Sequence, residues 1–76
     1  MATDEDAAEA GFMALEGVQT VLSISRSQAY ALVRSGALRA IQVGGRGQWR
    51  AERRELQAYI HRCYEQTAPI VAQENI

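Results

Sequence analysis

The chain has 76 residues, of which 47% are hydrophobic and 22% charged, and its formal net charge is -1. This composition is typical of a soluble globular domain, and the length allows one small core but excludes a large enzyme with a deep, enclosed active site. No apolar stretch approaches the roughly 18 to 20 residues that span a bilayer, and the acidic start of the chain is unlike the basic start of a secretory signal, so we expect a cytoplasmic protein without membrane contact.

Cysteine and histidine are too few to hold the fold together or to bind a structural metal. The only cysteine, Cys63, has no partner for an intramolecular disulfide, and with the only histidine, His61, it falls short of the four ligands of a structural zinc site. The glycine-rich run at residues 44–47 does not follow a strand and open a helix, as a phosphate-binding loop does. The chain has no nucleophile elbow and no zinc-protease motif. We therefore expect no enzymatic activity, no cofactor, no metal and no small-molecule substrate.

Charge is distributed unevenly along the chain. Residues 1–16 carry five acidic side chains and no base, residues 17–64 carry all eight arginines against two glutamates, and residues 65–76 carry two further glutamates. Arginine pairs bidentately with phosphates and with guanine edges, and it stays ionised. The near-neutral total therefore conceals a basic middle segment that fits a polyanion, with a solvated mixed surface as the alternative.

The first predicted helix follows an acidic leader. Residues 1–11 contain no large apolar side chain after Met1, so we expect a disordered leader and a domain that begins near Phe12. Within residues 15–22 the apolar side chains recur at the spacing of a short amphipathic helix. These side chains are Leu15, Val18, Val21 and Leu22.

A second helix is predicted over residues 26–35. Ser25 is placed to cap its start, and Gly36 is free to adopt the left-handed conformation that ends it. One side of this helix is apolar and would face a core, whereas the opposite side is small, polar and cationic. The apolar side comprises Ala29, Leu32 and Val33, and the exposed side comprises Ser27, Ala31 and Arg34. Two short helices joined by about three residues form a helix-turn-helix.

A β-hairpin is predicted next, with strands at residues 41–43 and 49–51. A four-residue loop would pair Gln42 with Trp49, whereas a five-residue loop pairs apolar residues with each other. The five-residue loop, 44–48, is therefore expected. It pairs Val43 with Trp49 and Ile41 with Ala51, places Gln42 and Arg50 together on the outer face, and leaves Arg46 at the tip.

A third helix is predicted from Glu52 to about Thr67, with Pro69 marking its end. Its apolar stripe comprises Leu56, Tyr59, Ile60 and Cys63. The remaining residues, 68–76, form a tail in which Ile70 and Val71 either extend the core or mediate self-contact.

Four residues have a structural and a functional interpretation. Trp49 is interpreted as the core anchor of the hairpin rather than as a platform for base stacking. Tyr30, at the margin of the second helix, either packs or contacts a phosphate through its hydroxyl. His61 is interpreted as a surface residue, and Cys63 as a small buried hydrophobe rather than a reactive thiol.

In this order and spacing, three segments carry a family resemblance: SISRSQAYALVRSGAL at 23–38, AIQVGGRGQWR at 40–50 and LQAYI at 56–60. The stretch from about residue 13 to residue 60 resembles the excisionase-type helix-turn-helix family, which is related to the MerR DNA-binding domain. The resemblance implies a mainly α fold with a small β-hairpin, the winged helix-turn-helix, over residues 12–67. One departure is Ala14, which stands where family members usually carry a Thr or Ser cap.

The resemblance also implies a function. Family members place the second helix in the major groove of double-stranded DNA and the wing, which is the hairpin, against the backbone or minor groove. We therefore expect a small bacterial transcriptional regulator; an excisionase that bends DNA and a protein-interaction adaptor remain as alternatives. One small module makes a small interface, so two or more copies are expected on the site. The candidate DNA contacts are Arg26, Ser27, Gln28, Tyr30 and Arg34 on the helix, and Arg46 and Arg50 on the wing.

Overall fold

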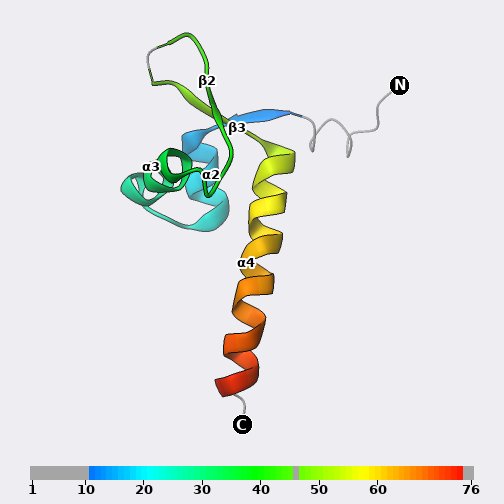
Figure 1. Ribbon diagram of the computed structural model, residues 1–76. Coiled ribbons are helices and arrows are strands. Elements are labelled where there is room, and N and C mark those ends of the chain that lie inside the picture. The colour runs from blue at the N-terminus through cyan, green and yellow to red at the C-terminus, as the bar shows by residue number, and fades with distance from the viewer. Residues whose placement is uncertain (1–10, 46, 75–76) are drawn as a thin grey trace, which may run out of the picture.

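The computed structural model describes residues 11–45 and 47–74, and its elements form a winged helix-turn-helix (Figure 1). The elements are β1 (Phe12–Ala14), α2 (Leu15–Leu22), α3 (Arg26–Ser35), β2 (Ile41–Gln42), β3 (Trp49–Glu52) and α4 (Arg53–Glu74). The two short helices lie together on one side of the sheet, and α4 leaves the sheet as a long projecting rod. The predicted fold class is confirmed. The predicted leader lies outside the described residues except for its last position.

The bounds of α2 and α3 agree with the sequence prediction, because local signals determine them. The Ser25 hydroxyl accepts a hydrogen bond from the backbone N–H of Gln28 at 3.1 Å, and the Gln28 side-chain oxygen accepts one from the backbone N–H of Ser25 at 2.9 Å. This reciprocal pair is a capping box, which satisfies two backbone donors at the start of α3. Gly36 ends the helix at φ +83°, in the left-handed region.

The hydrophobic core lies between the inner face of the sheet, α2, α3 and the start of α4. Val18 and Leu38 are its largest fully buried side chains. The complete buried set is Met13, Leu15, Val18, Ala29, Val33, Leu38, Ala51 and Leu56. Val21, which the sequence placed on the apolar stripe of α2, is instead 52% exposed. The stripe prediction therefore holds at Leu15, Val18 and the partly buried Leu22, and is wrong at Val21.

The sheet has three antiparallel strands in the order β1-β3-β2, so the sequence prediction of a two-stranded hairpin was incomplete. The strand that it missed, β1, is only three residues long, which is too short for a period-2 pattern to be recognised. Met13 lies opposite Ala51 in the pairing of β1 with β3. A hydrogen bond of 2.8 Å from the Arg53 backbone N–H to the Gly11 carbonyl ties the start of β1 to the start of α4.

The predicted hairpin register is wrong by one residue. Gln42 pairs with Trp49 and Ile41 with Arg50, which is the register of the four-residue loop. The prediction assumed that Ile41 must cover Ala51, but Met13 of the unrecognised strand β1 occupies the position opposite Ala51. Ile41 is consequently free to face outward and is 49% exposed. Gln42 and Arg50 therefore lie on opposite faces of the sheet, since neighbouring positions along a strand alternate.

The third helix, α4, begins one residue later than predicted and continues to Glu74, through Pro69. The prediction that it ends near Thr67 is wrong. A proline inside a helix removes one backbone hydrogen bond and crowds the carbonyl group four residues earlier, but at this exposed position neither change disturbs a packed core. Arg62 donates a hydrogen bond of 2.9 Å to the Ala37 carbonyl, which fastens α4 to the segment that follows α3.

Candidate nucleic-acid interface

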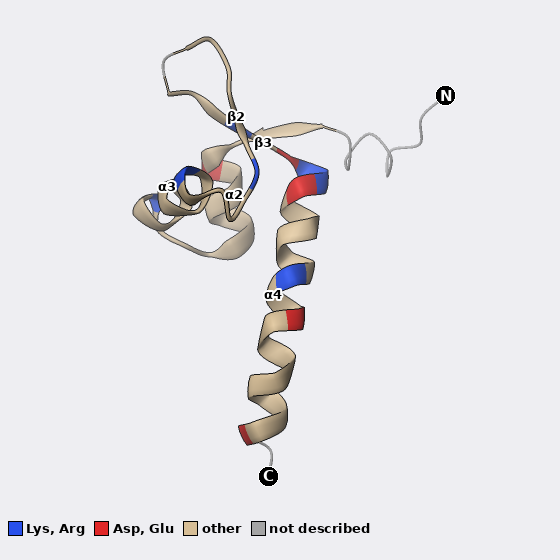
Figure 2. Ribbon diagram, in the orientation of Figure 1, with Lys and Arg blue, Asp and Glu red and all other residues tan. Residues whose placement is uncertain are grey.

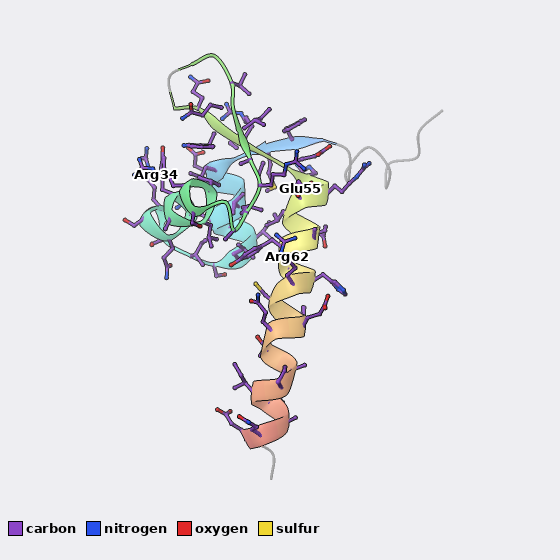
Figure 3. The ribbon with its side chains drawn as sticks, in the orientation of Figure 1. Arg34, Glu55 and Arg62 are labelled. Atoms are coloured by element: carbon purple, nitrogen blue, oxygen red, sulfur yellow. The ribbon has the colours of Figure 1, made fainter. Side chains whose placement is uncertain are left out.

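The exposed side of α3 carries a row of two arginines with a tyrosine between them. The guanidinium carbons of Arg26 and Arg34 lie 5.5 Å and 5.2 Å from the centre of the Tyr30 ring. The three residues are four apart, so they occupy one side of the helix. Figure 3 shows Arg34 on the side of α3 that faces away from α4. Cation–π attraction to the shared ring favours this placement of both arginine side chains without a ligand.

The surface around this row is slightly hollowed. A shallow depression of about 470 Å³ is lined by Arg26, Ser27, Tyr30, Ala31 and Arg34. Ser27 and Ala31 are small, so the backbone of α3 can approach another surface closely between the two long arginines. The depression therefore has arginines at its edges and small side chains at its bottom. The edge of a nucleic-acid groove fits this shape.

The guanidinium group of Arg26 stays positively charged at every physiological pH. A hydrogen bond with Tyr30 raises the pKa of the Arg26 guanidinium above its already high ordinary value, and the nearby Glu16 carboxylate acts in the same direction. Arg26 is fully solvent-exposed, so water and salt screen its interactions. Arg26 consequently presents a permanent positive charge, and its attraction to an anionic ligand depends on ionic strength rather than on pH.

A second depression, of about 420 Å³, joins α3 to the wing. Arg26 and Tyr30 line it from α3, and Gln48 and Arg50 line it from the wing. The Arg50 guanidinium donates a hydrogen bond of 2.9 Å to the carbonyl of Trp49, which holds this half-buried side chain along β3. The remaining lining residues are Ala14, Leu15, Glu16, Gly47 and Trp49. The two depressions share Arg26 and Tyr30, so helix and wing border one continuous surface, which we call the α3–wing surface; its described charged residues are Arg26, Arg34, Arg50 and Glu16.

The structure places the other candidate residues as follows. Ser27 is exposed on α3, whereas the side-chain oxygen of Gln28 is engaged in the capping box and leaves the amide N–H groups for a ligand. Arg46 lies outside the described residues. Gln48 was missed by the sequence reasoning, because the incorrect register placed it inside the loop; in the observed register it closes the loop at the tip, where its carbonyl accepts a hydrogen bond of 3.0 Å from the Val43 backbone N–H.

The residues with two interpretations are also located. Tyr30 and Trp49 are both half-buried and pack against the core, and both line the second depression. His61 is exposed on α4 and lies 2.8 Å from Glu65. Cys63 is half-buried; a hydrogen bond with it, together with partial burial, raises the pKa of Tyr59 above its ordinary value. His61 and Cys63 therefore belong to α4 and not to the α3–wing surface.

Arginines and glutamates are mixed around the core, whereas the far half of α4 carries no arginine (Figure 2). Basic residues lie on α3, on the strands and on the first half of α4. The part of α4 beyond Arg62 carries two acids, Glu65 and Glu74, and no arginine.

Within residues 11–45 and 47–74, no three side chains of His, Cys, Asp or Glu gather to hold a metal ion. No described helix combines the length and the apolar character that crossing a membrane requires.

A comparison with protein families assigns this architecture. The model of a helix-turn-helix domain family matches residues 15–64, about two thirds of the chain, which covers α2, α3, the wing strands and the first half of α4. The chain therefore belongs to this family, the excisionase-type helix-turn-helix family that the sequence resemblance indicated. Membership implies a DNA-binding protein. No curated protein and no solved structure matches the chain significantly.

Proposed function

We propose that this protein is a small bacterial transcriptional regulator that binds double-stranded DNA without catalysis. In this proposal α3 enters the major groove, and the wing lies on the backbone or in the minor groove beside it. The observation that carries the proposal is the row of Arg26, Tyr30 and Arg34, in which both guanidinium groups lie over one ring, on the exposed side of the second helix of a helix-turn-helix. Such a protein acts where the bacterial chromosome lies, in the cytoplasm.

Each side chain of the α3–wing surface has a proposed role. Arg34, at the outer end of the row, reads a base edge, since a guanidinium pairs bidentately with guanine. Arg26 and Arg50 border the same depression from two elements, so both contact phosphates on one strand. The Tyr30 hydroxyl donates to a phosphate while its ring holds both arginines. Ser27, Gln28 and, on the wing, Arg46 add contacts proposed from their sequence positions.

The matching experiment is fluorescence anisotropy of a labelled random-sequence duplex, titrated at several salt concentrations. The variant Arg26→Ala/Arg34→Ala/Arg50→Ala removes three charges from the α3–wing surface. Because each lost phosphate contact reduces the slope of log K against log salt by about 0.9, binding should weaken strongly and become less dependent on salt.

A charge-matched control removes three exposed arginines elsewhere, at Arg39, Arg53 and Arg54. It should bind DNA nearly as well as the unchanged protein. Equal losses in both triple variants would contradict a localised surface, and absence of binding by the folded, unchanged protein at low salt would overturn the proposed function.

Two alternatives start from specific observations. Membership of an excisionase-type family favours a recombination factor that bends DNA, and energy transfer between dyes at the two ends of a bound duplex would reveal a bend. The five acids among residues 1–16 favour an adaptor that docks on a basic protein. An adaptor predicts weak DNA binding that deletion of residues 1–10 does not improve, whereas a leader that competes with DNA predicts improvement.

A further inference from the structure

The second half of α4 extends past the core that holds its first half. With 22 residues the helix is about 33 Å long. Leu56 is buried and Ile60 packs against the core, whereas every side chain from residue 64 to residue 74 is exposed. Figure 1 shows this half projecting away from α2, α3 and the sheet.

An apolar stripe nevertheless continues along the projecting half. Leu56, Ile60, Cys63, Thr67 and Ile70 follow one another at alternating steps of four and three residues, which is the spacing of a helix seam that packs against another helix. Beside this seam, Tyr64 is 75% exposed and Val71 47% exposed, and Ile70 itself is 53% exposed. The core of this domain covers the seam only as far as Cys63.

The projecting half of α4 has no contact with the core and contains a proline. Pro69 removes one backbone hydrogen bond from its middle and crowds the carbonyl group four residues earlier. As the continuation of a formed helix it needs no nucleation of its own, but these turns are weaker than those of the first half. Packing against a further surface would therefore stabilise them.

A shallow apolar groove lies where the covered and uncovered parts of the seam meet. It has a volume of about 220 Å³ and is lined by Leu22, Ile60, Cys63, Tyr64 and Thr67. One helix thus carries an apolar recess and, one to two turns further on, the exposed side chains of Ile70 and Val71. Because the recess and the protruding side chains lie on the same helix, two copies related by a two-fold axis can each place these side chains in the recess of the other.

We propose that α4 pairs antiparallel with α4 of a second copy of this chain, with the two-fold axis at Thr67. In this register Val71 of each copy faces Cys63 of the other, and Ile70 faces Tyr64. The side chains of Ile70 and Val71 enter the apolar groove of the other copy. This pairing is independent of the DNA contacts of the α3–wing surface, and it supplies the second copy that a small DNA-binding module uses.

Charge identifies the occupant as a second copy. Between Ile60 and Val71 the seam carries no charged side chain, so a charged partner finds no complement there, whereas a second copy offers the same apolar side chains and the same groove. In the proposed register the two Glu74 side chains lie at opposite ends of the pair and do not face each other. Only about three turns of each helix carry uncovered apolar side chains, so the interface should be smaller than the roughly 1,200 Å² of typical specific interfaces and the dimer should dissociate on dilution.

Sedimentation equilibrium of the 76-residue chain without DNA tests the pairing. The unchanged protein should shift with concentration from the monomer mass of 8.4 kDa toward twice that value. Ile70→Glu places a charge in the seam and should leave only monomer, whereas Gln73→Glu, on the opposite side of α4, should still dimerise. Both sites lie outside the core, so thermal unfolding should show that both variants fold.

Cysteine cross-linking tests the register. Under mild oxidation Val71→Cys should form a covalent dimer through residue 63 of one copy and residue 71 of the other. Cys63→Ala/Val71→Cys and Gln73→Cys should not cross-link, since their thiols are offset along the pair or face away. A protein that stays monomeric at all concentrations, or Ile70→Glu that still dimerises, would overturn the proposal; cross-linking of the Cys63→Ala double variant would overturn the antiparallel register.

Discussion

Tyr30 determines how the two arginines of α3 are presented, because both guanidinium groups lie over its ring. The ring and the hydroxyl can be separated by substitution. Tyr30→Phe keeps the ring and should weaken binding to every DNA sequence alike, by about tenfold to a hundredfold, the cost of one net hydrogen bond to a charged phosphate. Tyr30→Ala also releases the arginines and should weaken binding further. Anisotropy titrations on several duplexes check both; a Tyr30→Phe variant that binds normally would leave packing as the role of this residue.

Arg34 and Arg50 should differ in kind. Arg34→Ala should cost about 1–3 kcal/mol on the preferred site and relax the sequence preference there, because a base contact is lost. Arg50→Ala should weaken binding to all sequences about equally, because a phosphate contact is lost. Competition titrations with the preferred site and with single-base variants of it separate the two. Equal losses across sequences for Arg34→Ala would contradict base reading.

Ala14 leaves the start of α2 without a side-chain cap, although its backbone already has the extended conformation of an N-cap, with φ -68° and ψ 161°. Ala14→Ser should therefore stabilise the fold by about 1 kcal/mol, because the serine oxygen can accept from a free backbone N–H of the first turn. In a domain of this size the melting temperature should rise by about 4–8 °C. Ala14→Val adds no acceptor, so a similar rise in that variant would argue against capping.

At the scale of elements, the sequence predicted best what neighbouring residues decide. Ser25, Gln28 and Gly36 determine the ends of α3 through bonds within a few residues, and those ends are as predicted. The wing register depends instead on Met13, which is remote in sequence and lies on a strand of three residues. Without that strand, apolar pairing favoured the wrong register by one residue.

The end of α4 shows a different limit. Pro69 is a strong local sign of a helix end, yet the apolar seam continues through it to Ile70 and Val71. The spacing of the apolar residues is visible in the sequence, but neighbouring residues do not determine the surface against which they pack. The arginines of α3 were predicted as contacts from their place on the second helix and from the family resemblance, whereas their common contact with the Tyr30 ring and the contribution of Gln48 required the fold.

At the scale of the whole molecule, the α3–wing surface and the projecting half of α4 are separate, so DNA contact and self-association can be varied independently. If two copies bind one site, the salt dependence of the binding constant should reflect the phosphate contacts of both copies. The unchanged protein on a site with two half-sites should show about twice the slope of log K against log salt that Ile70→Glu shows on the same duplex. On a duplex with one half-site the two proteins should bind alike, because the DNA-contacting residues are unchanged.

The spacing of the half-sites distinguishes a pre-formed dimer from copies that bind DNA independently. A pre-formed pair places two α3 helices at a fixed separation, so affinity should fall when half-sites are moved from one helical turn apart to one and a half turns apart. Gln73→Glu keeps the seam and should show the same spacing preference as the unchanged protein. An unchanged protein whose affinity is indifferent to spacing would mean that copies bind independently, and the α4 pairing would then have no part in DNA recognition.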